Sequence, residues 1–434
     1  MASTSRVRSL ALDGALDETI DWRFKSFPSG PPTSIREIGA RGWNVLGGEF
    51  MLPVMVLKAS ALRHNIDAMA VLCRRSGISL APHGKTAMAP QLLQMQLDAG
   101  AWAVTAATTS QVRVWRSFGM ERVILANELV EPASIAWVAG ELSRDREFDF
   151  YCLVDSVPGV RLLDEALERS RLERRMKVLL ELGLAGGRTG ARTSVEAHDV
   201  AAAVRASRHL ALAGVEAFEG IIGSADLDAD LKAIDDFLGG LRRLVVELDG
   251  LGAFERAEEI IVTAGGSAFL DRVIADLAEP WGVSRPVRLV LRSGCYLTHD
   301  AAHYKRLSPF GTRLADTGPL EEALEAWGVV LSSPEPGLAV LGFGKRDVPY
   351  DLELPVPRLF KRGDDAPGPL TGEARIVALN DQHAYLRHGG TVDLRVGDLV
   401  GCGVSHPCTA FDRWRLLPVV DEQYRVIDAV VTYF

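Results

Sequence analysis

A lysine follows a short apolar segment in the hexapeptide Ala81-Pro82-His83-Gly84-Lys85-Thr86. The apolar segment is predicted to be a strand and Pro90–Leu97 a helix, so Lys85 is expected in the loop between them. In α/β barrels this kind of loop lies at the face that carries the reactive groups. A lysine partly shielded from water gives up its proton more readily, and its neutral amine can then attack an aldehyde and form an imine. The alternative is a surface lysine in a turn.

Two glycine-containing segments are predicted at the same face. Gly265-Gly266-Ser267 precedes a helix, and Ser293-Gly294 follows the next predicted strand. Backbone N–H groups in such loops can hold an anion, and barrels often bind phosphate at their last two loops. The alternative is an ordinary turn. An imine-forming lysine together with a phosphate site favours pyridoxal phosphate (PLP), which carries both an aldehyde and a phosphate.

Arg188 lies in a third glycine-rich segment, Gly186-Gly187-Arg188-Thr189-Gly190. It is a candidate for contact with the cofactor ring or with a substrate carboxylate. A surface arginine in a flexible loop is the alternative. His83 either orients the cofactor or packs beneath the loop of Lys85, and the sequence leaves both possibilities open.

A second kind of chemistry is indicated near the C-terminus by Ser405-His406-Pro407-Cys408. In an extended segment, residues i and i+2 point the same way, so His406 and Cys408 can face one divalent ion. Imidazole and thiolate suit Zn²⁺, although Mn²⁺ or another metal remains possible. A packed cysteine beside a capping histidine is the alternative. His383, in Asn380-Asp381-Gln382-His383, is a candidate third ligand, an acid–base group, or a turn histidine.

Short apolar segments alternate with helical segments over about two hundred residues, which predicts a (β/α)₈ barrel. An open doubly wound sheet is the alternative, but no GxGxxG motif follows the first strand. Beyond residue 300 the pattern becomes that of a mostly antiparallel β domain, and Leu354–Pro369 is predicted to be an exposed loop. The expected strands of this domain are Trp327–Leu331, Leu338–Leu341, Ala374–Leu379, Tyr385–Leu386, Thr391–Leu394, Asp398–Cys402 and Tyr424–Tyr433. The expected division is residues 1–50 as an extension partly joining the β domain, 51–300 as the barrel, and 301–434 as the β domain. The expected barrel strands are Ser79–Pro82, Ala101–Ala106, Arg122–Ala126, Phe148–Val154, Met176–Leu182, Leu210–Ala217, Glu259–Ala264 and Arg288–Leu291.

Composition narrows the class of protein. The formal net charge of −9 argues against nucleic acid and anionic membranes as partners. No apolar run is long enough to span a bilayer, and the first residues lack the apolar core of a secretory signal. Five scattered cysteines fit a reducing compartment, so a cytoplasmic protein is expected.

Taken in order, Pro82-His83-Gly84-Lys85-Thr86, Arg188-Thr189-Gly190, Gly265-Gly266-Ser267, Gly294-Cys295-Tyr296 and His406-Pro407-Cys408 resemble the fold-type III PLP enzymes. The nearest branch is that of D-serine dehydratase and D-threonine aldolase, related to alanine racemase. The resemblance implies an alanine racemase-like barrel and β domain, and a homodimer with active sites at the subunit interface. It assigns Lys85 as the PLP-binding lysine and His406 with Cys408 as the metal pair. The residues that it implies for cofactor binding are Lys85, Arg188, Thr263, Gly265, Gly266, Ser267, Gly294, Cys295 and Tyr296.

The expected activity is a metal-assisted dehydration and deamination of a D-β-hydroxy amino acid, such as D-serine or D-threonine. The products would be a 2-oxo acid and ammonia, with Lys85, His83 and His383 as candidate catalytic groups. In the aldolases of the resembled branch an aspartate usually stands where this chain has Cys408, which favours dehydration. The alternatives are a retro-aldol lyase that gives glycine and an aldehyde, a racemase, and a non-catalytic PLP-binding protein. The segment Arg292-Ser293-Gly294-Cys295 differs from the sequence that usually precedes the tyrosine in the resembled family.

Overall fold

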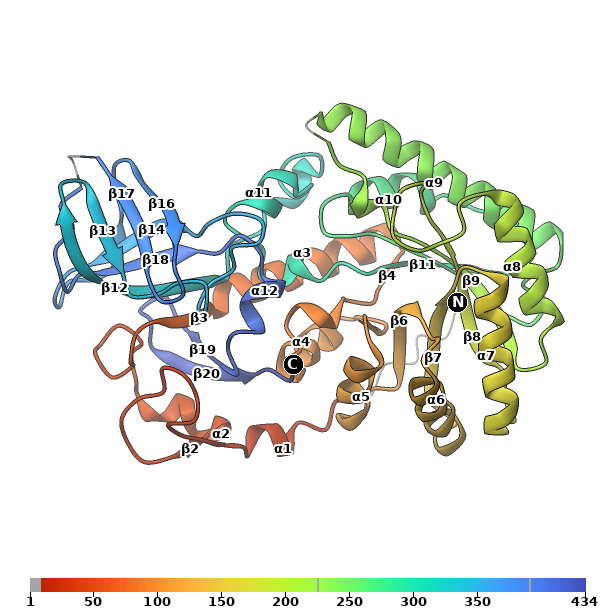
Figure 1. Ribbon diagram of the computed structural model, residues 1–434, viewed down its shortest axis with the longest axis horizontal. Coiled ribbons are helices and arrows are strands. Elements are labelled where there is room, and N and C mark those ends of the chain that lie inside the picture. The colour runs from red at the N-terminus through yellow and green to blue at the C-terminus, as the bar shows by residue number, and fades with distance from the viewer. Residues whose placement is uncertain (1–8, 225, 390–391) are drawn as a thin grey trace.

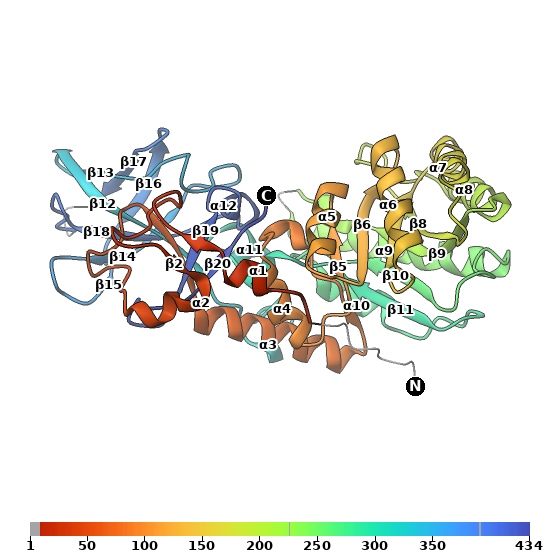
Figure 2. The same cartoon turned by 90° about the horizontal axis from the view of Figure 1, so that it is seen from below.

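A computed structural model describes residues 9–224, 226–389 and 392–434. The chain forms a barrel of parallel strands and a separate set of antiparallel strands, which stand side by side in Figure 1. Helix α3 (Ala59–Ser76) extends from the antiparallel part towards the barrel, as Figure 2 also shows. Chain order gives the reason: α3 follows a strand of the antiparallel part, β3 (Val54–Lys58), and precedes the first barrel strand, β4.

The barrel strands run parallel in the order β4-β11-β10-β9-β8-β7-β6-β5. The sheet curls back on itself, because Trp102 N–H donates to Leu80 O (2.7 Å) and Thr105 N–H donates to Pro82 O (2.9 Å). Side chains such as Leu179 and Ile261 fill the interior. The predicted fold class is confirmed, and every predicted barrel strand overlaps an observed one. The strands are β4 (Ser79–Leu80), β5 (Val104–Ala106), β6 (Arg122–Glu128), β7 (Asp149–Val154), β8 (Met176–Leu182), β9 (Leu210–Ala217), β10 (Ile260–Ala264) and β11 (Val287–Leu291).

Helices connect these strands and cover the outside of the barrel (Figure 1). Several begin at a side-chain cap. Thr193 and Glu196 form a capping box on α8, and Ser156 caps α7. The helices are α4 (Pro90–Asp98), α5 (Thr109–Ser117), α6 (Pro132–Arg144), α7 (Val157–Ser170), α8 (Ser194–Ala206), α9 (Leu227–Gly250) and α10 (Leu270–Leu277).

The antiparallel part combines strands from both ends of the chain. β3 pairs with β12 on one side and, in parallel, with β19 on the other. The main sheet has the order β15-β14-β18-β12-β13-β17-β16, and β19 also pairs with β20. The strands are β12 (Leu324–Glu335), β13 (Leu338–Leu341), β14 (Val356–Lys361), β15 (Gly368–Pro369), β16 (Ala374–Leu379), β17 (Ala384–His388), β18 (Leu399–Gly403), β19 (Leu416–Val420) and β20 (Val426–Val431).

Two predictions about this part of the chain were wrong. Leu354–Pro369, expected to be an exposed loop, contains β14 and β15, and β14 pairs along β18. The prolines that indicated a loop are accommodated: Pro357 lies at a register shift, where a missing N–H is tolerated. Of the predicted strand Thr391–Leu394, Thr391 lies outside the described residues, and the rest is not a strand.

The N-terminal segment packs on the antiparallel part. Two short strands, β1 (Thr19–Ile20) and β2 (Thr33–Ser34), pair with each other, and helices α1 (Asp13–Leu16) and α2 (Ile35–Ile38) flank them. Ile20 and Ile38 share a buried cluster with Val426 and other residues of β19 and β20. The division of the chain at residues 50 and 300 stays a prediction. No helix in the described part of the chain is both long and apolar enough to cross a membrane.

Candidate functional site

Lys85 lies at the barrel mouth, at the carboxyl end of β4, in the short helix η2 (Gly84–Thr86). It is half-buried, and among the described residues its ammonium group forms no ion pair or hydrogen bond. The segment after β11 presses on the same turn: a Cβ on Gly294 would lie 2.7 Å from His83 O and 2.6 Å from Thr86 Oγ1. Only glycine fits at this contact, which fixes the backbone around Lys85.

His83 immediately precedes this turn. Burial holds the pKa of its imidazole well below the usual value, and the nearby positive charges of Lys85, Arg292 and Arg188 act in the same direction. Its buried Nδ1 has no hydrogen-bond partner among the described residues. A neutral imidazole with a free nitrogen can accept a proton or hold a polar atom of a ligand.

The predicted anion site is formed by backbone N–H groups after β10 and β11. Gly265 takes a positive φ of 100°, and its N–H and that of Gly266 donate to the two carboxylate oxygens of Glu219 (3.0 and 2.7 Å). An anionic group therefore already sits on part of this loop. In the described structure the N–H groups of Ser267, Ala268, Ser293 and Gly294 have no acceptor.

These free donors fit the phosphate of PLP. Buried backbone N–H groups without acceptors are rare in folded proteins, and Ala268, Ser293 and Gly294 are buried, so their grouping beside a glycine-rich turn indicates a place where an anion can bind. Lys85 and the unpaired Nδ1 of His83 stand at the same mouth. The residues present thus match the two ends of the cofactor, its phosphate and its aldehyde.

Arg292 is buried in the upper barrel and ties two strands together. Its guanidinium donates to Thr263 Oγ1 (2.8 Å) and Ala217 O (3.1 Å) and pairs with Glu216. Burial raises the pKa of Glu216 to about 7, even though Arg292 acts in the opposite direction. Thr263, predicted to bind the cofactor, accepts a hydrogen bond from Arg292 in this structure, and its role towards the cofactor stays a prediction.

The structure places three other predicted site residues, Tyr296, Arg188 and His383, in separate surroundings. The Tyr296 hydroxyl accepts a hydrogen bond from Gln96 Nε2 (2.7 Å) and faces α4. The Arg188 guanidinium stacks on the Phe218 ring, 4.8 Å from its centroid, close enough to the mouth to affect His83. His383 is exposed in the hairpin turn between β16 and β17, and the fold of one chain does not bring it to Lys85.

The predicted metal pair lies beside η2, although it belongs to the other end of the chain. Cys408, the first residue of α12 (Cys408–Phe411), has its Sγ 3.4 Å from Thr86 Oγ1 and 3.4 Å from Cys295 Sγ. Asp351 accepts a hydrogen bond from His406 Nδ1 (2.5 Å) and another from Thr409 Oγ1 (2.7 Å). The structure therefore brings His406, Cys408 and Cys295 to the loop of Lys85.

The electrostatics of this pair suit a cation. A hydrogen bond from Cys295 holds the pKa of the Cys408 thiol well below the usual value, and His406 and Thr86 reinforce it. Burial lowers the pKa of His406, but Cys408 and Asp351 outweigh it and raise the value to about 9. A thiolate beside an imidazole whose other nitrogen is held by a carboxylate is a donor set suited to zinc.

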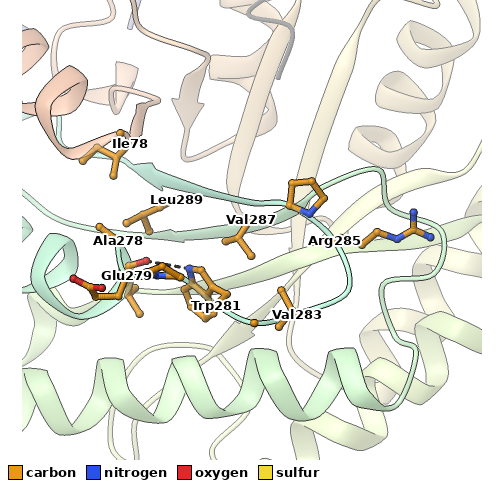
Figure 3. A pocket seen from close by; sticks show the side chains of 13 residues that line it. Ile78, Ala278, Glu279, Trp281, Val283, Arg285, Val287 and Leu289 are labelled. Carbon is orange, nitrogen blue, oxygen red and sulfur yellow. Dashed lines mark hydrogen bonds between the residues drawn. The ribbon is translucent and has the colours of Figure 1, made fainter. Parts of the chain in front are cut away.

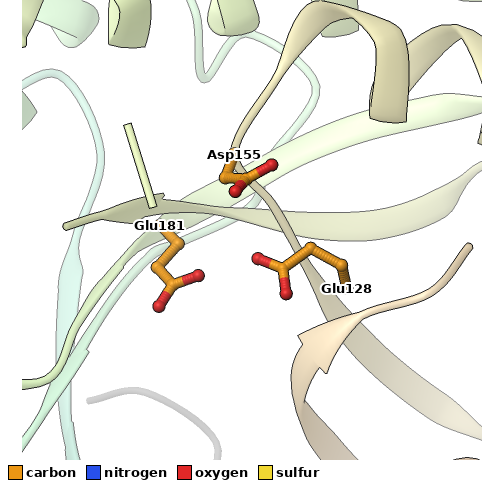
Figure 4. Close-up of side chains that lie close together, drawn as sticks. All are labelled: Glu128, Asp155 and Glu181. Carbon is orange, nitrogen blue, oxygen red and sulfur yellow. The ribbon is translucent and has the colours of Figure 1, made fainter. Parts of the chain in front are cut away.

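Acidic side chains line the other half of the mouth. Glu128, Asp155 and Glu181, from the ends of β6, β7 and β8, place carboxylate oxygens within 4.8 Å of one another, and Figure 4 shows their side chains converging. Burial and the neighbouring Glu181 raise the pKa of Glu128 to about 8. The mouth thus combines a cationic side, near Lys85, with an acidic side.

Cavities at the opposite end of the barrel do not carry this chemistry. The pocket in Figure 3, of about 340 Å³, lies beside Trp281 and Leu289 at the amino ends of the strands. A larger one of about 910 Å³ is crossed by ion pairs such as Arg122–Asp149 (2.9 Å). We assign the site from the reactive groups and free N–H donors at the mouth.

Sequence reasoning missed three residues that shape the site. Glu219 is fully buried and occupies the glycine N–H groups, and Glu216 supports Arg292. Both are carboxylates at the end of an apolar strand, a signal that was available in the sequence. Asp351 lies 55 residues before His406, and no spacing rule connects them.

Comparisons with known proteins agree with this geometry. The alanine racemase N-terminal domain model matches residues 57–250, and the serine dehydratase domain model matches residues 323–420. The curated 3-hydroxy-D-aspartate aldolase of Paracoccus denitrificans is 26% identical over 352 residues, covering 81% of this chain and 83% of the relative. The resemblance to fold-type III PLP enzymes predicted from the motifs is confirmed.

Solved structures show the same fold. The D-threonine aldolase of Filomicrobium marinum has a TM-score of 0.73 at 23% identity, covering 88% of this chain and 95% of the other. The D-threo-3-hydroxyaspartate dehydratase of Delftia sp. HT23 has a TM-score of 0.66 at 18% identity, covering 88% and 97%. A structure of such a dehydratase in a metal-free form is also similar. The relatives named here are lyases, as the sequence predicted.

Proposed function

We propose that this protein is a PLP-dependent lyase that removes water and ammonia from a D-β-hydroxy amino acid. The observation that carries the proposal is the contact between Thr86 and Cys408, which puts the metal pair beside the turn of Lys85. A base for the α-proton and a cation near the β-hydroxyl are two groups that favour β-elimination. The names of the relatives support the substrate class.

PLP, when bound, would withdraw electrons from the α-carbon of the amino acid and make its proton acidic. The free N–H groups of Ser267, Ala268, Ser293 and Gly294 would hold its phosphate. His406 and Cys408 would hold the divalent ion, which would supply Lewis-acid polarisation of a β-hydroxyl.

Lys85 supplies the proton transfer in this proposal. Its amine accepts the α-proton, and the resulting ammonium passes this proton to the hydroxyl group as the Cβ–O bond breaks, so that the hydroxyl leaves as water. The unsaturated amine that results hydrolyses to a 2-oxo acid and ammonia. Gly294 keeps the turn in place, because no side chain fits between it and His83.

Retro-aldol cleavage is the second candidate, and two observations favour it. The curated relatives from Paracoccus denitrificans and Arthrobacter sp. are both named aldolases. The buried Nδ1 of His83 has no hydrogen-bond partner among the described residues and can accept the hydroxyl proton that this reaction removes. Cleavage of the Cα–Cβ bond would then give glycine and an aldehyde.

Product analysis separates the two reactions. Purified protein supplied with PLP and Zn²⁺ is expected to convert D-serine or D-threonine to a 2-oxo acid and ammonia in equal amounts. Lys85→Ala should abolish both turnover and the visible absorbance of bound cofactor. The matched control is Lys232→Ala, which removes an exposed lysine of α9. Glycine and aldehyde would establish the aldolase instead, and a coloured protein inert towards D- and L-hydroxy amino acids would refute both.

A further inference from the structure

Two thiols from distant parts of the chain meet at the candidate metal site. Cys295 begins the short helix η4 (Cys295–Leu297) after β11, and Cys408 lies 113 residues later, yet their sulfur atoms are 3.4 Å apart. Cys295 is buried, at 5% exposure. The other three cysteines, Cys73, Cys152 and Cys402, are free and buried elsewhere. Cys295 also belongs to the segment Arg292–Cys295, whose sequence differs from that usual in the resembled family.

The separation of the sulfur atoms distinguishes the possible relationships between the thiols. A disulfide requires about 2.0 Å between them. Two thiolates on one tetrahedral zinc, each about 2.3 Å from the metal, lie roughly 3.8 Å apart. The observed 3.4 Å is close to the second arrangement and needs only a small movement of either side chain.

The third donor is already oriented. Asp351 holds Nδ1 of His406 at 2.5 Å, and Thr409 fixes the same carboxylate, so Nε2 is the nitrogen left for a metal. Thr86 Oγ1, 3.4 Å from Cys408 Sγ, can donate to a thiolate there. Metal-ligating residues are usually held by outer hydrogen-bond partners. Here a carboxylate accepts from the histidine, and a hydroxyl can donate to the thiolate.

We infer that Cys295 is a third protein ligand, so that the metal pair is a Cys₂His site formed by Cys295, His406 and Cys408. The inference rests on the metal-assisted reaction proposed above. Three protein ligands leave one open position on a tetrahedral zinc, as in catalytic zinc sites. That position would be available to the β-hydroxyl oxygen of the substrate.

X-ray absorption at the zinc edge of the PLP-loaded full chain tests the inference directly. The wild type is expected to show two sulfur neighbours at about 2.3 Å, and Cys295→Ser only one. In Co²⁺-loaded protein, the thiolate-to-metal absorption, taken as a difference from the metal-free form, should fall to about half in the variant. Zinc affinity should fall at least about 10-fold, the smallest effect expected even for an outer support. Asp351 is such an outer support, so Asp351→Asn should weaken zinc binding but keep two sulfur neighbours on the metal.

Cys402→Ala is the matched control, because it removes a buried thiol of β18 and should leave the zinc spectrum unchanged. Two sulfur neighbours in Cys295→Ser, or a single one in the wild type, would overturn the inference. Absence of bound zinc in the wild type would also overturn it. The visible absorbance and the products from D-serine, measured on the same samples, report separately on the proposed reaction.

Discussion

Replacing Arg292 with methionine is expected to lower the free energy of unfolding by about 3–5 kcal/mol, the usual cost of leaving one partner of a buried ion pair alone. Both side chains are almost completely buried, because Arg292 is 6% exposed and Glu216 is 1% exposed. The change also leaves Thr263 Oγ1 and Ala217 O without their donor. Methionine keeps most of the side-chain volume, so the loss reports on charge and hydrogen bonding.

The loss should depend on pH in a defined direction. The pKa of Glu216 is raised from 4.5 to about 7, so its protonation adds stability that is fully present below pH 4.5 and disappears as pH rises through 7. Without Arg292 the pKa rises further, and ionisation of the native carboxyl is postponed to higher pH. The difference between wild type and variant should therefore be larger at about pH 9 than at about pH 5.

Urea unfolding followed by tryptophan fluorescence measures this difference at both pH values. Arg292→Met combined with Glu216→Leu is expected to recover most of the stability, because the unpaired charge is removed. Equal losses at the two pH values, or a loss below about 1 kcal/mol, would contradict the view that this pair supports the barrel mouth.

Two further changes test the same region. Gly294→Ala should cost about 1–3 kcal/mol and weaken cofactor retention, because its Cβ would lie 2.7 Å from His83 O. Gly140→Ala, where nothing lies within 4 Å on α6, should instead stabilise by about 0.5–1 kcal/mol, and equal effects in thermal unfolding would refute this reasoning. Glu128→Gln should make the protein more stable than wild type at about pH 9 but not at about pH 5. The pKa of Glu128 is raised from 4.5 to about 8, so ionisation of this carboxyl destabilises the wild type progressively as pH rises through this range. Partial exposure limits the gain to about 2 kcal/mol, and denaturation at the two pH values measures it.

The barrel was predictable because its strands are short apolar runs between helices that begin at recognisable caps, such as Thr193. Three strands of the antiparallel part that the sequence did not predict, β14, β15 and β19, all contain proline. Proline lowers the expectation of a strand, yet Pro357 lies at a register shift and Pro418 pairs opposite Ala429. Local pattern cannot reveal such accommodation, because it depends on the neighbouring strand.

The site shows the same division. Motifs located the turn of Lys85 and the glycines after β10, because backbone chemistry follows local sequence. They could not show that Glu219 occupies those glycines or that Tyr296 faces Gln96. Nor could they show that Cys295 touches Cys408, since side chains far apart in the chain meet only once the two parts pack. Spacing rules therefore found the segments, while tertiary packing determined the role of each side chain.

The position of β3 sets an order for folding during synthesis. Val54–Lys58 leaves the ribosome early, but its partners in β12 and β19 follow more than 260 residues later. The barrel strands, from β4 to β11, are all complete before either partner exists. A barrel that forms during synthesis therefore forms while the apolar strand β3 has two unpaired edges, and unpaired strand edges favour aggregation. Pairing of β3 with β12 and β19 then completes the antiparallel part once these later strands have been synthesised.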